Sequence, residues 1–455
     1  MINWQAHVLP KQFNRRLKNF KRPVNPPLIL TAGFFALIIL GTCLLLLPFA
    51  SAESLSFIQA FFTASSAVTV TGLVVIDTGT ALTTFGQCVV MVLIQIGGIG
   101  FMTVAVISFL SIGKNLGLKQ RLLASQAFDT SDLNGVIHVA KCVITYSLII
   151  QTIAFCLLFI SWVDDYGIAG SAYQSLFYTI SAFNNAGFAL DSNSLMAFKS
   201  DISVNLIISA LFIIGGLGFT VLIDIYQQRR WHKLATNTRI VLIASAVINC
   251  SAFLLIFLFE YSNPATLANL PINEQVIAAW FQAVTPRTAG FNTLPISQLT
   301  SDSTLLTLLL MIIGGGSVST ASGIKIGTFV ILLLAMYSYL RQKPQVTIFN
   351  RELSDKLVIK ALSVVILYLF TAFLSIMIMS KIEQASLLDI TFEVISALST
   401  VGLSRDFTSN LSMPSQLIII LLMLIGRVGP LTFAYCFAKP KLQPLKFAKT
   451  TIQIG

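Results

Sequence analysis

One short glycine motif occurs four times in the chain, and its chemistry would be that of backbone carbonyl oxygens. The copies read AVTVTGL, AFNNAGF, TPRTAGF and ALSTVGL, and their glycines lie 115, 103 and 112 residues apart. The side chains before the glycine differ from copy to copy, whereas the glycine does not change. A backbone-permissive residue fixed among varying side chains indicates that backbone carbonyl groups are the ligands. Four such loops around an axis would replace the hydration shell of an alkali cation.

We therefore predict an ion-selective filter built from the residues at and just before each glycine. These residues are Thr69, Val70, Thr71, Gly72, Asn184, Asn185, Ala186, Gly187, Thr288, Ala289, Gly290, Ser399, Thr400, Val401 and Gly402. The alternative is that the four glycines form tight turns at helix ends or permit close packing of helices.

A short apolar segment leads into each motif, at 57–71, 173–186, 276–289 and 388–401. Each segment holds only about 10–14 residues before the motif, too few to cross roughly 30 Å of hydrocarbon, so a re-entrant helix is expected. Its partially negative C-terminus would favour a cation at the membrane centre. An aromatic residue precedes every glycine by ten positions and is expected to pack the short helix: Phe62, Phe177, Trp280 and Phe392.

Longer apolar segments flank each motif and predict two membrane crossings per unit. The first helices are expected at 28–47, 143–163, 240–259 and 357–379, and the second at 89–112, 206–225, 305–340 and 417–438. Two crossings return the chain to the same side, so all four units have one orientation. The sequence predicts an all-α polytopic membrane protein with eight transmembrane and four re-entrant pore helices around a pseudo-fourfold pore. Its single membrane domain, 1–455, would comprise repeats 1–112, 113–230, 231–342 and 343–455.

The second helix of the third repeat is expected to break. Its 36 residues would make one helix of about 54 Å at about 1.5 Å per residue, far longer than the hydrocarbon is thick. Its middle is poor in helix formers, and irregular backbone at this depth is tolerated only against protein or water. The predicted gate residues are Gly314, Gly315, Gly316, Ser317, Ser319, Thr320, Ser322, Gly323 and Lys325. The alternative is one long helix that protrudes from the membrane and packs through its glycines.

A second landmark follows each motif and ends differently in the last repeat. It reads Ile-Gly-Gly at 96–98, 214–216 and 313–315, but Ile-Gly-Arg at 425–427. A charge at this depth costs several kcal/mol unless it faces water or a partner. Arg427 is therefore expected to face the axis below the filter, as a barrier to cations and a partner of the gate. The alternative is a structural salt bridge. Arg287 is expected to brace the third filter segment, and Lys325 could extend to the interface.

Composition and charge agree with a membrane location. The chain is 55% hydrophobic and 10% charged, and its net charge is +11. On the predicted topology, 23 of the 29 Lys and Arg residues lie in the N-terminal arm, the connections between repeats and the tail. The positive-inside rule places these segments and both termini in the cytoplasm, which accounts for the charge without nucleic acid. Most acidic residues fall on the other side, as a cation-attracting mouth or as solvated loop charges.

Several other classes have no support in the sequence. A signal peptide would need an apolar core of roughly 7–15 residues, shorter than segment 28–47. The six cysteines show no short-range pairing, and the three histidines form no metal cluster. Nucleophile elbows, phosphate-binding loops and zinc spacings are absent from the sequence, so no enzymatic activity and no covalent cofactor are expected.

Four helix–pore-loop–helix units with one filter glycine each resemble the Trk/Ktr/HKT superfamily of potassium transporters, over essentially the whole chain. Trk-type members usually carry two extra N-terminal helices, whereas only a basic arm of 27 residues precedes the first unit here. The chain is therefore most similar to the membrane subunit of bacterial Ktr systems. Gly72 stands where sodium-selective plant members carry serine, which favours potassium.

This resemblance implies K⁺ uptake across the bacterial cytoplasmic (inner) membrane, with an intramembrane loop as gate and Na⁺ as a candidate activating ion. It also implies a homodimer of this chain and a cytosolic RCK-type ring that binds nucleotides and regulates transport. Two rivals are kept: a non-selective or sodium-permeable four-repeat cation channel, and a coupled transporter of small organic solutes. The voltage-gated form of the first needs an arginine-rich membrane helix, which is missing. The second favours paired broken helices, whereas a break is expected only in the third repeat.

Overall fold

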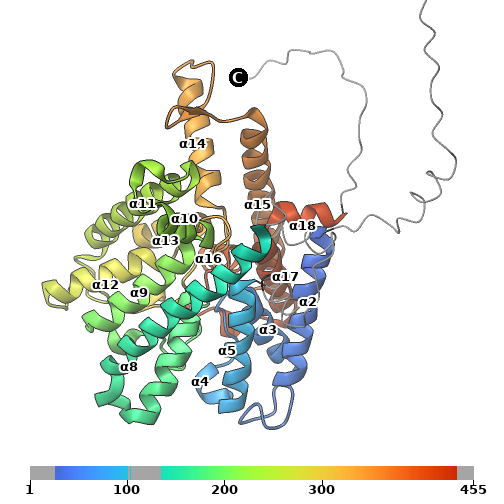
Figure 1. The fold of residues 1–455 in the computed structure, drawn as a ribbon. Coiled ribbons are helices and arrows are strands. Elements are labelled where there is room, and N and C mark those ends of the chain that lie inside the picture. Colours follow the sequence, from blue (N-terminus) through green and yellow to red (C-terminus); the bar gives the residue numbers. More distant parts are fainter. Residues whose placement is uncertain (1–25, 101–102, 104–134, 438–455) are drawn as a thin grey trace, which may run out of the picture.

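The protein, seen in a computed structural model, is a bundle of apolar helices with one short hairpin, and the structure describes residues 26–100, 103 and 135–437 (Figure 1). The basic arm, nearly all of the first connection and the basic tail lie outside these residues. The helices are α2 (Pro26–Leu45), α3 (Phe57–Thr69), α4 (Thr78–Ala81), α5 (Thr84–Ile99), α8 (Gly135–Phe183), α9 (Ile202–Leu217), α10 (Phe219–Gln228), α11 (Thr236–Glu260), α12 (Ile272–Val284), α13 (Ser301–Ile312), α14 (Ile326–Leu340), α15 (Asp355–Ile382), α16 (Leu387–Ser399), α17 (Met413–Val428) and α18 (Pro430–Phe437). Short 3₁₀ turns lie at Met196–Phe198, Trp231–Lys233, Ile296–Gln298 and Thr408–Asn410, and strands β1 (Thr347–Ile348) and β2 (Arg351–Glu352) form the hairpin.

The short helices that lead into the glycine motifs form the core of the molecule. α3, α12 and α16 each have 13 residues, and in the second repeat the same role falls to the part of α8 after its kink at Gly167. Every residue of α3 from Phe62 to Thr69 is buried, hydroxyl side chains included. By contrast, α15 exposes large apolar side chains such as Phe370 and Phe373, each more than 60% exposed. Lipid-facing outer helices therefore enclose a more polar centre, as a bilayer requires.

Four helices among the described residues are long and apolar enough to cross a membrane: Pro27–Leu45, Val139–Phe183, Thr236–Glu260 and Asp355–Ile382. The number rises to six if each of two bent helix pairs counts as one span. In the third repeat the second crossing is divided between α13 and α14, and in the first repeat the predicted continuation to residue 112 lies beyond the described part. The count of eight spans stays a prediction.

The second helices of repeats two and four are bent, which the sequence analysis did not foresee. α9 and α10 meet at 92°, and α17 and α18 at 100°, where single helices at 206–225 and 417–438 were predicted. Gly218 and Gly429 stand at the bends with φ of 104° and 94°, a conformation that L side chains rarely adopt. Pro430 follows directly and could not continue the hydrogen-bond ladder of α17. The expectation that only the third repeat is broken was therefore wrong.

Two carboxylates at the ends of outer helices fix the helices that follow the motifs. Glu260, at the end of α11, accepts hydrogen bonds from the Thr300 amide (2.9 Å) and hydroxyl (2.8 Å) at the start of α13. Glu383, just after α15, does the same for Ser412 at the start of α17. Burial raises the pKa of Glu383, but the Ser412 and Ser415 hydrogen bonds outweigh it and hold the pKa below its ordinary value. These acids serve as helix caps, a role that the sequence analysis did not consider.

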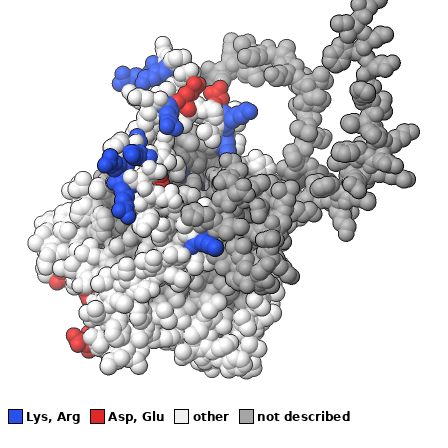
Figure 2. Space-filling view, in the orientation of Figure 1, with Lys and Arg blue, Asp and Glu red and all other residues white. Residues whose placement is uncertain are grey.

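Lysine and arginine gather over the end of the molecule where α14 and α15 protrude (Figure 2). This end carries the hairpin, beside which Arg341 and Lys343 lie over the ring of Tyr337. The opposite end of the same view shows only scattered acidic residues. In this view the basic side chains thus lie mainly at one end, where a few acidic side chains also lie.

Candidate ion-conducting site

All four glycine motifs share one backbone feature. In each, the glycine and the residue two positions earlier have positive φ. The pairs are Val70 (57°) and Gly72 (88°), Asn185 (59°) and Gly187 (67°), Thr288 (67°) and Gly290 (82°), and Thr400 (50°) and Gly402 (91°). A left-handed β-branched residue is uncommon and costs free energy. Because this costly conformation recurs in three of the motifs, we conclude that the surrounding structure imposes it.

Three of the short helices end in a Schellman motif, which accounts for part of this conformation. In α3 the Val70 amide donates to the Ala67 carbonyl (3.2 Å) and the Thr71 amide to the Ser66 carbonyl (2.9 Å). The same pattern holds for Asn185 and Ala186 after α8, and for Thr400 and Val401 after α16. The third repeat differs, because there the Ala289 amide donates to the Thr285 carbonyl (3.0 Å), four residues back. The capping bonds leave the next carbonyl groups free of helical partners.

The four glycines form a closed ring. A Cβ atom on Gly72 would lie 2.3 Å from the Ala186 carbonyl oxygen, and one on Gly187 would lie 3.0 Å from the Ala289 oxygen. A Cβ on Gly290 would lie 2.4 Å from the Val401 oxygen. The ring closes at Gly402, whose Cβ would lie 2.1 Å from the Thr71 oxygen. Each glycine thus faces the carbonyl that precedes the glycine of the next repeat, and an added Cβ would crowd that carbonyl, most of all at Gly72, Gly290 and Gly402.

Hydroxyl groups hold the ring from behind. The Gly72 amide donates to Ser66 Oγ (3.0 Å), and the Gly402 amide donates to Ser396 Oγ (3.1 Å). In the second repeat Ser181 Oγ donates to the Phe188 carbonyl (2.7 Å). The buried side chains therefore bond to the backbone of their own segment. This arrangement leaves the carbonyl groups as the polar atoms that line the ring.

The glycines of the second landmark let the following helix approach the short helix closely. A Cβ on Gly97, Gly215 or Gly426 would lie 2.1 Å from the carbonyl oxygen four residues before the motif glycine of the same repeat. In the third repeat Gly314 instead meets the Ser322 carbonyl oxygen at 1.8 Å. The same landmark thus packs against a pore helix in three repeats and against the glycine-rich segment in the other.

The predicted break of the third repeat is present, and its segment 313–325 folds into a loop. α13 ends at Ile312 and α14 begins at Ile326. The Gly314 amide donates to the Ile324 carbonyl (2.9 Å), so the two ends of the loop lie side by side. Its middle joins the bend of the second repeat, because the Gly316 amide donates to the Gly216 carbonyl (2.8 Å). The loop is closed at its base and attached to a neighbouring repeat.

Side chains of two other repeats hold the middle of the loop. Arg427 donates to the Thr320 carbonyl and also to the Gly97 and Gly98 carbonyls of α5. The Thr320 hydroxyl donates to Asn185 Oδ1 (2.8 Å), a predicted filter residue. Arg427 therefore bonds only to carbonyl oxygens, and none of its described bonds is the salt bridge considered as an alternative. The link from Asn185 to the loop was missed, because no sequence signal pairs two residues 135 positions apart.

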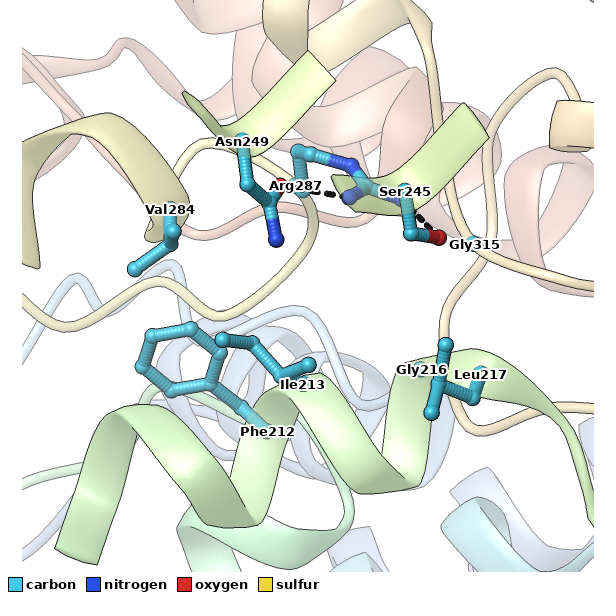
Figure 3. Close-up of a pocket in the computed structure, with 9 residues that line it drawn as sticks. All are labelled: Phe212, Ile213, Gly216, Leu217, Ser245, Asn249, Val284, Arg287 and Gly315. Atoms are coloured by element: carbon cyan, nitrogen blue, oxygen red, sulfur yellow. Dashed lines mark hydrogen bonds between the residues drawn. The ribbon is translucent and has the colours of Figure 1, made fainter. Parts of the chain in front are cut away.

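Arg287, which was expected to brace the third filter segment, bonds to α11 and to the loop. Its guanidinium donates to Asn249 Oδ1 (2.6 Å) and to Ser245 Oγ (3.5 Å) on α11 (Figure 3). It also donates to the Gly314 carbonyl (3.4 Å) at the start of the loop. A cavity of about 20 Å³ adjoins these groups, with Gly315 on its wall. That volume has room for about one water molecule.

The remaining predicted residues lie at the loop or close behind the filter. Lys325 precedes α14 and donates to the Ala321 carbonyl (2.6 Å), so it turns back to the loop. Ser319 Oγ donates within the loop to the Gly316 carbonyl (2.7 Å). Asn184 donates through Nδ2 to Gln95 Oε1 (2.7 Å) and is therefore tied to α5. The structure brings the predicted filter and gate residues into one connected centre.

These features define a class of protein: a multi-pass membrane protein in which four segments of one chain meet in a ring beside an irregular intramembrane loop. Residues 9–445 match the family model TrkH, described as cation transport protein, and the chain belongs to this family. It transports ions and is not an enzyme.

Similar proteins and a similar structure cover nearly the whole chain. It is 47% identical to Ktr system potassium uptake protein B of Bacillus subtilis (94% of this chain, 97% of that protein) and 38% identical to the protein of the same name from Vibrio alginolyticus (96% and 97%). It is 36% identical to the potassium/sodium uptake protein NtpJ of Enterococcus hirae (92% and 94%). The crystal structure of the potassium transporter TrkH from Vibrio parahaemolyticus has the same fold, with a TM-score of 0.74 at 19% identity (92% and 86%).

Proposed function

We propose that this protein carries K⁺ into the cell, and that the ring of four glycines is its selectivity filter. The observation that carries the proposal is the closed ring, in which each glycine faces the Thr71, Ala186, Ala289 or Val401 carbonyl of its neighbour. Rings of backbone carbonyls replace the hydration shell of K⁺ in selective pores. The names of the relatives, two of them potassium uptake proteins and one a potassium/sodium uptake protein, support the same ion class.

The loop 313–325 is the gate in this proposal, and Arg427 is its latch. The guanidinium beside the Thr320 carbonyl presents a fixed positive charge next to the ring, which opposes the passage of a cation. Opening would move the loop away from Arg427 and from Asn185. Both contacts are hydrogen bonds at the middle of the loop, so one displacement would break both.

The protein would work with partners. The words "Ktr system" in two relatives' names imply a second component. We assign to it the cytosolic nucleotide-binding ring that the resemblance implies, and we place it at the basic end beyond α14 and α15. A homodimer of this chain and activation by Na⁺ complete the proposal, with both termini in the cytoplasm.

The test is ion flux through the purified chain and its regulatory partner in liposomes, with and without Na⁺ and under a voltage clamp. We expect K⁺ to be preferred over Na⁺. Gly72→Ser, Gly290→Ser and Gly402→Ser should each lower that preference by about tenfold or more, because the added Cβ would displace a carbonyl oxygen of the ring.

Gly167→Ser is the matched control. Gly167 also has positive φ (67°), but a Cβ there would meet nothing within 4 Å. It carries the backbone cost of a side chain without touching the ring. Unchanged selectivity in all three ring variants would reject the filter, whereas wild-type flux of K⁺ and Na⁺ at equal rates would favour the non-selective channel.

A further inference from the structure

Glu393 is a buried carboxylate that the proposed pathway does not use. It lies in α16, nine residues before Gly402, and is fully buried. The residues at the same position before the other three glycines are Thr63, Tyr178 and Phe281. The surroundings of the ring therefore carry this carboxylate in one repeat out of four.

The hydrogen bonds of Glu393 show how its carboxylate is oriented. Ser404 Oγ accepts from the Phe407 amide (3.1 Å) and the Thr408 amide (3.3 Å), which occupies both of its lone pairs. Its own hydrogen is therefore donated to Glu393 Oε2, at 2.8 Å. The Thr408 hydroxyl bonds to Oε1. Both carboxylate oxygens have partners on the segment that follows the ring (residues 403–412), and Ser404 is only two residues beyond Gly402.

The positive charge on the segment that follows the ring already pairs with another carboxylate. Arg405 on this segment pairs with Asp389 Oδ1 (2.8 Å) and donates to Thr304 Oγ1 (3.3 Å). Asp389 lies one helical turn before Glu393, and Asp406 on the segment that follows the ring is exposed. In the described part of the chain Glu393 has no ion pair. Burying a charge without a counter-charge is costly.

We propose that the cation in the glycine ring is the counter-charge of Glu393, and that this residue sets the apparent affinity for K⁺. It acts through its field and not as a ligand, because both oxygens are bonded to hydroxyl groups. In a low-dielectric site such a charge attracts a nearby cation more strongly than an exposed carboxylate does. The inference rests on the proposed function of the ring.

Glu393→Gln separates the charge from the hydrogen bonds. The amide oxygen can accept from Ser404, and the amide nitrogen can donate to Thr408 Oγ1, so the geometry is kept while the charge is lost. We expect a rise in the KM for K⁺ of about fivefold, with the maximal rate and the K⁺/Na⁺ preference nearly unchanged. Glu393→Asp should restore part of the affinity.

Ser404→Ala is the complementary variant, because it removes the brace and keeps the charge. Asp406→Asn is the control, since it removes an exposed carboxylate from the same segment. Asparagine tolerates the left-handed φ of 62° at this position. The charge of Asp406 is screened by salt, so at about 0.15 M ionic strength the KM should stay near that of the wild type.

The outcomes separate this inference from the proposed function. A wild-type KM in Glu393→Gln, together with altered selectivity in Ser404→Ala, would overturn the charge role and leave only a brace. An equal rise in KM for Asp406→Asn would also overturn it, because any nearby carboxylate would then suffice. Failure of the proposed function itself would be seen earlier, as wild-type protein that carries no K⁺.

Discussion

At the scale of single residues, the centre is made of backbone held in a costly shape. Val70 and Thr400 are β-branched and left-handed, which few structures tolerate. The capping bonds and the buried hydroxyl groups of Ser66 and Ser396 maintain this shape. Side chains thus matter here for where they hold the carbonyl oxygens, which explains why their types vary among the motifs.

Arg287 provides a test at this scale. Asn249→Ala leaves the buried guanidinium without the acceptor at 2.6 Å, so it should destabilise the protein by about 1–3 kcal/mol. In a double-mutant cycle with Arg287→Lys, the two effects should be less than additive. The measurement is the unfolding midpoint in detergent. Ser251→Ala, exposed on the same helix, is the control and should change little; full additivity would contradict the interaction.

At the scale of elements, breaks and bends in the helices after the motifs distinguish the repeats. Repeats two and four bend at Gly218 and Gly429, whereas repeat three opens into the loop between α13 and α14. The loop touches Asn185 of one filter segment through Thr320, and Arg287 of another through Gly314. Its position is therefore linked mechanically to two of the four ring segments.

Removal of the loop provides the test at this scale. Because Ile313 and Ile324 pair directly, deletion of 314–323 should join α13 to α14 with little displacement and raise K⁺ uptake. A milder variant, Thr320→Val, removes only the hydroxyl that bonds Asn185 and should raise basal flux by a smaller factor. Ser319→Ala, which breaks a bond within the loop, is its control. Lost or unaltered flux in well-inserted deletion protein would count against a gate.

Much of this element order could be predicted from the sequence, and the failures have physical reasons. The aligned glycines predicted the ring residues, and the glycine-rich segment predicted the break, because both features depend on local backbone propensity. The bend at Gly218 was hidden, since an isolated glycine in a helical pattern is tolerated. The Gly429-Pro430 pair, by contrast, was a visible break signal that the sequence analysis did not use. Glu393 was visible only as an acid in a re-entrant helix. Its partners, Ser404 and Thr408, become evident only in the structure, which shows where the segment after the ring lies.

At the scale of the whole molecule, charge and polarity are sorted along one axis. Basic residues gather at the end where α14 and α15 protrude, and the acidic caps Glu260 and Glu383 lie at the far ends of α11 and α15. The positive-inside rule then orients the protein. The loop leads through α14 to the basic end, whereas Glu393 precedes the ring in α16.

A pair of cysteine substitutions tests this orientation. Ser354 and Ser409 are exposed and lie toward opposite ends of α15. In a background without the six native cysteines, an impermeant thiol reagent added to intact cells should label Ser409→Cys and spare Ser354→Cys. Inside-out vesicles should show the reverse pattern. Labelling of both variants, or of the wrong one, from one side would refute the proposed topology.

Arg427 stands where the other three repeats have glycine. Such a single difference is possible only when all four repeats belong to one chain. In a tetramer of identical subunits, one arginine per subunit would place four arginines at the axis. Their combined positive charge would close the pore to cations permanently. Covalent linkage of the repeats lets a single arginine meet a single loop at the Thr320 carbonyl. A barrier of that size is small enough to be withdrawn by one movement. In the proposed gate, asymmetry is thus what makes the barrier reversible.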